Sequence, residues 1–141
     1  MSQAPESALE FNIELRWSDQ DLMGHVNNAR IMTLAEEARI RAMQQLQRTA
    51  GSDEPIEAVL RTSNTDFLAP IMYAGDCVVR IWVSKIGNSS FVMQHELRQN
   101  GNVAATVEAV VVMFSSVTQA PMQITDNVRK ALESASAASA R

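Results

Sequence analysis

The sequence has little cysteine, no excess of basic residues and no long apolar run, and each shortage excludes a class of protein. Its single cysteine, Cys77, can form no internal disulfide and has no second thiolate for a zinc cluster, so a buried strand position is expected for it. Twelve Lys and Arg against sixteen Asp and Glu give a net charge of −4. This balance argues against a nucleic-acid binder, because phosphate contacts need clustered cations. The absence of a long apolar run argues against membrane insertion.

The length and the first residues suggest one domain in the cytoplasm. The chain has 141 residues, enough for one domain with its own core, and no repeat or linker divides it. Its beginning, "MSQAPESALE", lacks the basic and apolar regions of a secretion signal, so a cytoplasmic location is expected. We therefore expect a single domain over 1–141, frayed from about 134 to 141 because the ending is small and polar.

Apolar periodicity divides the first third of the chain into a strand and a helix. Residues 9–17, "LEFNIELRW", alternate and predict a half-buried strand with Trp17 on its apolar side. After Gly24, apolar residues recur at spacings of three and four, which predicts a helix over about 26–48. The apolar arc of this helix is wide, because it includes Ile31 and Ile40, and it therefore favours a central helix with a sheet curved around it.

The rest of the chain has the pattern of an antiparallel sheet. Residues 56–116 are strand-like, with turns predicted at "KIGNSS" and "QNGN", and a short helix is expected over about 125–132. One strand, one long helix, four strands and a short helix predict an α+β domain with one five-stranded antiparallel sheet around one helix.

The junction between the first strand and the long helix, "DQDLMGHVNN", concentrates polar groups that suit acyl chemistry. Asp21 stands just before a helix start, where unpaired N–H groups and partial positive charge can stabilise a carbonyl oxygen that becomes negative. A carboxylate there can attack a polarised carbonyl or activate water. The structural alternative is that Asp19 or Asp21 only caps the helix while the asparagines satisfy turn backbone.

Metal binding fits the same stretch poorly. As a calcium loop it fails, because Met23 occupies a ligand position and Arg30 stands where a bidentate Glu is required. A zinc site would need a second histidine, and His95 lies on an apolar strand face, where a core or interface role is expected. No metal site is therefore expected.

The stretch "WSDQDLMGHVNNARIMTLAEEAR" resembles the active-site segment of the 4-hydroxybenzoyl-CoA thioesterase-like branch of the hotdog superfamily, especially its long-chain and broad-range acyl-CoA thioesterases. The likeness continues through "DFLAPIMYAGD", "KIGNSSF" and "VVVMFS", and covers about 11–121. It implies a hotdog fold, in which a five-stranded antiparallel sheet wraps around one long central helix. It also implies an acyl-CoA thioesterase that hydrolyses its substrate to a carboxylic acid and free coenzyme A, without metal or redox cofactor.

The resemblance assigns roles to individual residues. Asp21 would be the catalytic nucleophile or general base, and the backbone N–H of Asn28 would polarise the thioester carbonyl. Gly24 would let substrate approach the backbone, while His25 and Asn27 would line or brace the pocket.

Three further positions follow from the same resemblance. Asp19 is expected to be structural. Ile31 departs from the Tyr of many members, which affects the expected width or polarity of the acyl pocket. Other hotdog groups use a helix Glu, which makes Glu36 an outside candidate, although the run "EEAR" is better explained by exposed or interface ion pairs.

The resemblance also implies partners. A homodimer or homotetramer is expected, with joined sheets and substrate entering between subunits, and an unpaired sheet edge favours the same arrangement. Arg61, Arg80, Lys85 and Arg98 are cations that could meet the coenzyme A phosphates, without a phosphate loop to choose among them. The alternatives are a thioesterase for acyl carrier protein, a non-catalytic acyl-CoA-binding hotdog protein, which Asp21 argues against, and a hotdog hydratase, whose local pattern differs. The sequence does not specify the acyl chain.

Overall fold

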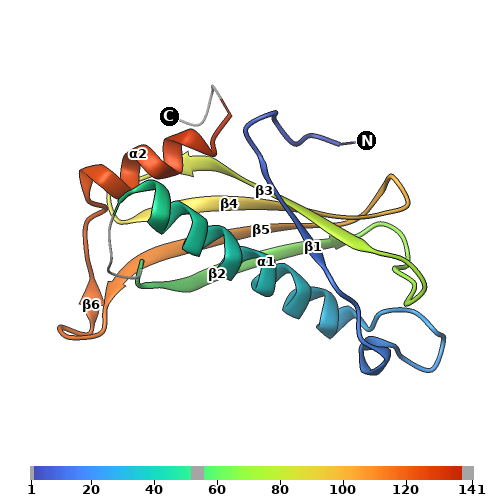
Figure 1. Ribbon diagram of the computed structural model, residues 1–141. Helices are drawn as coiled ribbons and strands as arrows, with labels where there is room; N and C mark the ends of the chain where they lie inside the picture. Colours follow the sequence, from blue (N-terminus) through green and yellow to red (C-terminus); the bar gives the residue numbers. More distant parts are fainter. Residues whose placement is uncertain (1, 52–55, 138–141) are drawn as a thin grey trace.

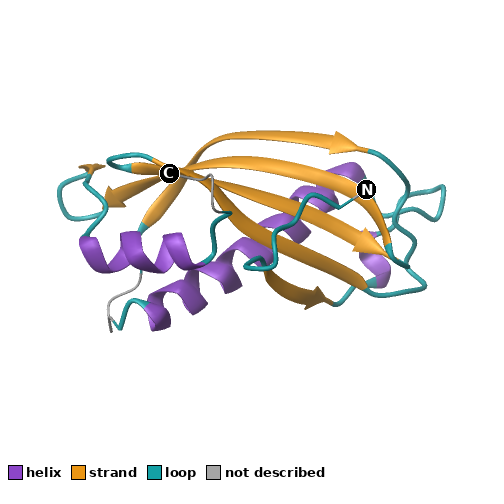
Figure 2. Cartoon of the chain, turned by 90° about the horizontal axis from the view of Figure 1, so that it is seen from above, coloured by secondary structure: helices purple, strands orange, loops and turns teal. Residues whose placement is uncertain are grey.

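The computed structural model describes residues 2–51 and 56–137, which form a curved sheet with two helices on one face (Figure 1). The elements in chain order are β1 (Leu9–Ile13), the 3-10 turn η1 (Trp17–Asp19), α1 (Asn28–Thr49), β2 (Ala58–Phe67), β3 (Cys77–Ile86), β4 (Ser90–Gln99), β5 (Asn102–Ser115), β6 (Ala120–Pro121) and α2 (Asp126–Ser134). The predicted α+β class with an antiparallel sheet is confirmed. Seen from above, the long strands arch over α1 (Figure 2).

The strands follow the order β1-β3-β4-β5-β2, and every neighbouring pair is antiparallel. The five predicted strands are joined by a sixth, β6, which adds two residues to β5. β1 and β2 are the edges of this path, and β2 carries mostly exposed side chains. The free edge of β2 therefore offers unpaired backbone groups to another strand.

The first strand is shorter than its alternating pattern predicts. β1 ends at Ile13, and the prediction that Trp17 lies on the buried side is wrong, because its side chain is 74% exposed. The cause is Asp19, whose carboxylate accepts a hydrogen bond from the Arg16 backbone N–H at 2.9 Å and turns the chain into η1. Leu15 keeps its place in the core.

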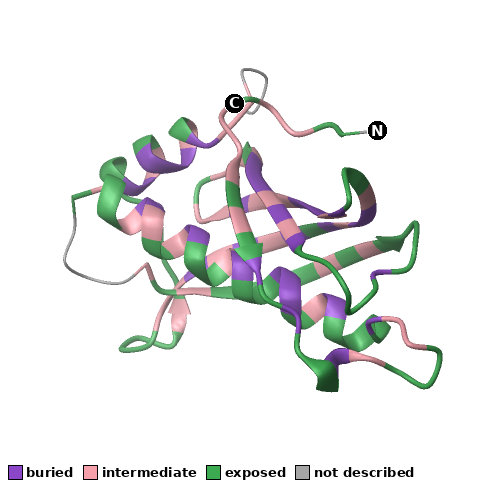
Figure 3. Cartoon of the chain, turned by 45° about the vertical axis from the view of Figure 1, so that its right-hand side comes forward, coloured by how far each residue is buried: buried purple, intermediate pink, exposed green. Residues whose placement is uncertain are grey.

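The long helix begins two residues later than predicted and ends one residue later. Asn27 is its N-cap, since its side-chain oxygen accepts a hydrogen bond from Ala29 N–H at 2.8 Å. Figure 3 shows buried and exposed patches alternating along the helix. Ile31 is buried as the wide apolar arc predicts, whereas Ile40 is exposed, so this chain alone does not cover the whole arc.

The C-terminal prediction is partly wrong. Residues 134–137 are not frayed: Ser134 belongs to α2, Ala135 is buried, and Ser136 forms a parallel bridge with Val83. The carbonyl of Ala135 accepts a hydrogen bond from Val83 N–H at 2.9 Å, which docks this segment on the end of β3. Residues 138–141 lie outside the described part of the chain.

The buried side chains form one hydrophobic cluster between α1, α2 and the sheet. Cys77 is buried within it, as expected for a small strand residue, and burial raises the pKa of its thiol to about 11. His95 is 1% exposed and donates from Nδ1 to the carbonyl of Val107 at 3.1 Å, which confirms the predicted core histidine. Neither described helix is long and apolar enough to cross a membrane.

Candidate active site

The loop between η1 and α1 is a tight backbone structure that presents Asp21 at the surface. Gln20 pairs with Val26, and Asp21 N–H donates to the carbonyl of His25 at 2.8 Å. Gly24 has φ +78°, in the left-handed region that favours glycine, and donates its N–H to the Asp21 carbonyl at 3.1 Å. An added Cβ at Gly24 would meet no atom within 4 Å, so backbone conformation rather than space requires this glycine.

One oxygen of the Asp21 carboxylate is hydrogen-bonded to the backbone of its own loop. Oδ1 accepts hydrogen bonds from Met23 N–H at 2.8 Å and His25 N–H at 3.3 Å. Oδ2 has no hydrogen-bond partner among the described residues, and the side chain is exposed. The backbone thus orients the carboxylate and leaves one oxygen to meet a substrate or a water molecule.

The start of α1 leaves one donor unpaired. Asn27 N–H donates to the Asp19 carbonyl at 2.8 Å, and Ala29 N–H is taken by the Asn27 side chain. Arg30 and Ile31 donate to the Asn27 carbonyl at 2.8 and 3.1 Å. Asn28 N–H has no acceptor in the described part of the chain, and it lies at the positive end of a long helix.

Asp21 and Asn28, the residues that carry these two groups, line the same cleft. A hollow of about 290 Å³ has Asp21, His25, Asn28 and Ile31 on one wall and residues 67–70 on the other. Gly24 and Asn27 do not line it: they contribute to a neighbouring hollow with Trp17 and Met23, and support the cleft through the turn and the helix cap. Asp21 lines both hollows.

Asp19 differs from Asp21 in position and partners. It is 1% exposed, and its carboxylate accepts from the Arg16 backbone at 2.9 Å and from the Arg16 guanidinium at 3.2 Å. These contacts are those of a structural residue that shapes η1, and they hold Asp19 away from solvent.

The second wall of the cleft was not identified from the sequence. Leu68 and Ala69 donate their N–H groups to the Ala104 carbonyl at 2.8 and 3.0 Å. The carbonyl of Ile71 accepts from Val26 N–H at 2.7 Å, and Met72 bridges to His25. This segment therefore joins the loop that carries Asp21 to the end of β2.

Gln99 holds Met72, two residues after that wall, and was also missed. Its side-chain oxygen accepts from Met72 N–H at 2.8 Å, and its amide donates to the Met72 carbonyl at 2.7 Å. The available signal was a polar residue at the end of an otherwise buried strand face, since Gln99 is itself buried.

The remaining candidates lie away from the cleft. Glu36 is exposed and lies 4.0 Å from Arg39, an ion pair of the kind predicted for the "EEAR" run. Glu37 is also exposed and lies 3.8 Å from Arg41, just beyond that run. Within residues 2–51 and 56–137, no three His, Cys, Asp or Glu side chains gather into a metal-binding group.

Comparison with known proteins identifies the family. The family model of the thioesterase-like superfamily matches residues 15–132. The uncharacterized protein YsmA of Bacillus subtilis (strain 168) is 25% identical over 122 residues, covering 85% of this chain and 82% of that protein.

Two solved structures carry the same likeness. A predicted thioesterase from Bacillus stearothermophilus is 28% identical with a TM-score of 0.83, over 92% of this chain and 97% of that chain. A thioesterase from Thermus thermophilus, solved in complex with coenzyme A and Zn, is 28% identical with a TM-score of 0.77, over 90% and 92% of the two chains. Because the family model covers most of its length, this chain belongs to the thioesterase-like superfamily and is a thioester hydrolase.

Proposed function

We propose that this thioester hydrolase acts on acyl-CoA, that its sheet and long helix form a hotdog fold, and that Asp21 and the N–H of Asn28 carry the reaction. The observation that supports this most is that Asp21, with one free carboxylate oxygen, and Asn28, with an unpaired helix N–H, line the same cleft. The thioester carbonyl oxygen would accept a hydrogen bond from Asn28 N–H, so that negative charge develops at the positive end of α1.

Asp21 then acts in one of two ways. As a nucleophile, Oδ2 attacks the carbonyl carbon, coenzyme A leaves as its thiolate, and water hydrolyses the resulting anhydride. As a general base, the carboxylate takes a proton from water while the water oxygen attacks, and that proton ends on the leaving thiolate. Both routes yield one carboxylic acid and one free thiol, and both use the same two groups of this chain.

Coenzyme A is the proposed thiol carrier because the similar Thermus thermophilus thioesterase was solved with coenzyme A bound. Of the four cations named from the sequence, Arg80 is already paired with Glu10 at 2.9 Å, and Arg98 contacts the carbonyl of Gly101 at 3.4 Å. Arg61 and Lys85 are exposed and have no such pairing within the described residues, so they are the better candidates for phosphate contacts.

We also propose that the active form is a homodimer or a tetramer of paired dimers, joined through β2. No other described strand of the same chain pairs with the outer edge of β2, and Val59, Leu60 and Phe67 are exposed on this strand. Pairing two β2 edges would satisfy their backbone groups and cover these side chains. Phe67 also lines the catalytic cleft, so substrate would enter between the subunits.

The test of the chemistry is the pair Asp21→Asn and Asp19→Asn. Asp21→Asn removes the reacting carboxylate and should lower turnover by about a hundredfold or more, measured as free thiol release across a series of acyl-CoA lengths. Asp19→Asn should lower the melting temperature more than the specific activity, because Asp19 is buried against Arg16. Near-normal turnover in folded Asp21→Asn would refute the proposal, and equal losses in both variants would mean that the two carboxylates act together.

A further inference from the structure

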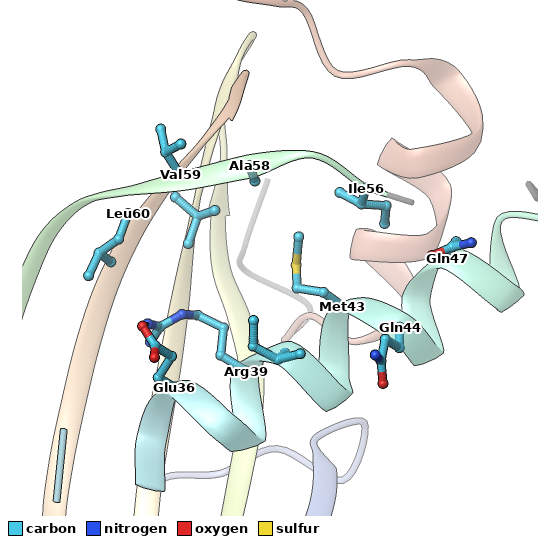
Figure 4. A pocket seen from close by; sticks show the side chains of 11 residues that line it. Glu36, Arg39, Met43, Gln44, Gln47, Ile56, Ala58, Val59 and Leu60 are labelled. Carbon is cyan, nitrogen blue, oxygen red and sulfur yellow. The ribbon is translucent and has the colours of Figure 1, made fainter. Parts of the chain in front are cut away.

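A second hollow, of about 300 Å³, lies between the middle of α1 and the first half of β2 (Figure 4). Its walls are largely apolar and include Met43 from the helix, Leu60 from β2 and Val111 from β5. Arg39 brings a guanidinium into this setting, and Figure 4 shows its side chain beside that of Glu36, below Leu60. Glu36, Gln44 and Gln47 also line the hollow, and Arg39 is the one cation among the described lining residues. A largely buried cation requires an explanation, because burying a charge is costly.

The guanidinium of Arg39 is poorly compensated. Its side chain is 11% exposed, and Nη1 makes one hydrogen bond, to Nε2 of His95 at 3.3 Å. Nδ1 of His95 donates to a carbonyl, and the Arg39 guanidinium can only donate, so Nε2 must accept with its lone pair and the ring is neutral. Burial lowers the pKa of His95 to about 4, with the Arg39 charge adding to the effect, so the imidazole supplies no counter-charge.

The nearest carboxylate does not neutralise Arg39 tightly. Oε2 of Glu36 is 4.0 Å from Nη2, and the Glu36 side chain is 63% exposed. Burial accordingly lowers the pKa of Arg39, with Glu36 acting against that effect. A guanidinium has five N–H donors in a planar fork, and most of those on Arg39 have no partner among the described residues. The complementary ligand is a carboxylate, which accepts two parallel hydrogen bonds from such a fork.

The cavity is remote from the catalytic cleft within one chain. Asn28 and Arg39 are separated by about 16 Å of helix, and Thr65 on β2 contacts Met32 on α1 between the two hollows at 2.8 Å. A two-fold pairing of β2 with its copy changes this relation. Antiparallel strands that overlap along their length place the Phe67 end of one beside the Ala58 end of the other, so the cavity of one subunit adjoins the cleft of its partner.

We propose that this cavity receives the far end of the acyl group held in the partner's cleft, and that Arg39 selects acyl groups that end in a carboxylate. The proposal rests on the proposed function and on the β2-paired dimer. Arg39 would then determine substrate specificity, because it contacts the end of the acyl group far from the thioester.

The test compares decanoyl-CoA with sebacoyl-CoA, which has the same chain ending in a carboxylate. Wild type should show the higher kcat/KM with sebacoyl-CoA, and Arg39→Met should lower the sebacoyl to decanoyl ratio about tenfold to a hundredfold, the scale of a charge-assisted hydrogen bond. Arg41→Met is the matched control, since Arg41 lies on the same helix with an exposed side chain paired with Glu37. Glu36→Gln removes the competing carboxylate and should raise the ratio. An unchanged ratio in Arg39→Met, or equal losses on both substrates, would overturn the proposal.

Two further measurements test thioester hydrolysis and the sharing of the site between subunits separately from the role of Arg39. If wild type releases no thiol from either substrate, the proposed function fails, and calorimetric binding of free sebacate to wild type and Arg39→Met still tests the site. In mixtures of Asp21→Asn and Arg39→Met subunits, mixed dimers should regain the wild-type ratio, because one site combines an intact Asp21 with Arg39 of the partner subunit. Hydrolysis at the Arg39→Met ratio in those mixtures would overturn the shared site.

Discussion

Replacing Asn28 by proline removes a single hydrogen-bond donor from the candidate site at little cost to the fold. Asn28 is the first residue of α1, where proline is well tolerated, and its N–H makes no hydrogen bond within the described chain. The preceding residue, Asn27, has φ −60° and ψ 141°, which is the extended conformation that a residue before proline requires. No helix hydrogen bond is lost, so the melting temperature should stay close to that of wild type.

The expected effect on catalysis is large by comparison. If Asn28 N–H stabilises the developing oxyanion, its removal should cost about 3 kcal/mol, or roughly a hundredfold in kcat, the scale measured for single oxyanion donors. Asn28→Ala keeps the N–H and removes only the side chain, so it should retain a substantial part of the turnover. The assay is steady-state thiol release for both variants, with circular dichroism and thermal melting as the control for folding.

A folded Asn28→Pro protein with the turnover of Asn28→Ala would refute this assignment. The structure limits what could replace Asn28 as the donor. Asn27 N–H is occupied by the Asp19 carbonyl, and Ala29 N–H by the Asn27 side chain. The His25 side chain, which lines the cleft, would be the next group to test.

Three other predictions concern stability and assembly. Burial lowers the pKa of His95 from 6.5 to about 4, so between these pH values the unfolded chain binds a proton that the folded chain excludes. The free energy of unfolding should therefore be highest above about pH 6.5 and fall by about 3 kcal/mol as the pH is lowered to 4. Urea titrations across this range check it, and His95→Gln should lack that part of the slope. Gln99→Leu loses both hydrogen bonds to Met72 and should lower stability by about 1–3 kcal/mol and turnover several-fold. An unchanged melting temperature would show that these two hydrogen bonds do not hold the segment in place. Light scattering at micromolar concentration should show a dimer or tetramer, and a stable, active monomer would remove the argument for a site shared across β2.

The fold was predictable where apolar periodicity was long and uninterrupted. The helix and the three central strands of the sheet, β3, β4 and β5, lie within a few residues of their predicted positions, because each buries a regular stripe. The failures are local and have tertiary causes. Trp17 continues the alternation in the sequence, but the buried carboxylate of Asp19 turns the chain before it. Ala135 and Ser136 have the composition of a frayed end, yet Val83 of β3 provides backbone pairing for both of them.

The site was predictable on one wall only. A local motif places Asp21 and Asn28 near one another, since they are separated by a single turn and a helix start. The opposite wall, residues 67–70, continues from the end of β2 and is held by Ala104, while Val26 and Gln99 hold residues 71 and 72 just after it. No periodicity along the chain encodes that juxtaposition, because it depends on the pairing of β2 with β5.

Many polar groups of the cluster "DQDLMGHVNN" are paired within the chain, but one carboxylate oxygen and one backbone N–H are not paired within the described residues. The Asp19 carboxylate accepts a hydrogen bond from the backbone at the start of η1, and the Asn27 side chain accepts one at the start of α1. These two side chains thus pair backbone groups that a strand-to-helix junction would leave open. One oxygen of Asp21 is used by its own loop. The second oxygen of Asp21 and the N–H of Asn28 stay unpaired within the described residues, and the two residues that carry this acceptor and this donor line one cleft. A purely structural cluster would be expected to pair its last polar groups internally, whereas a catalytic one must leave the reacting groups unpaired until substrate arrives. The residues that cap and turn the chain are thus what allows the other two to stay free.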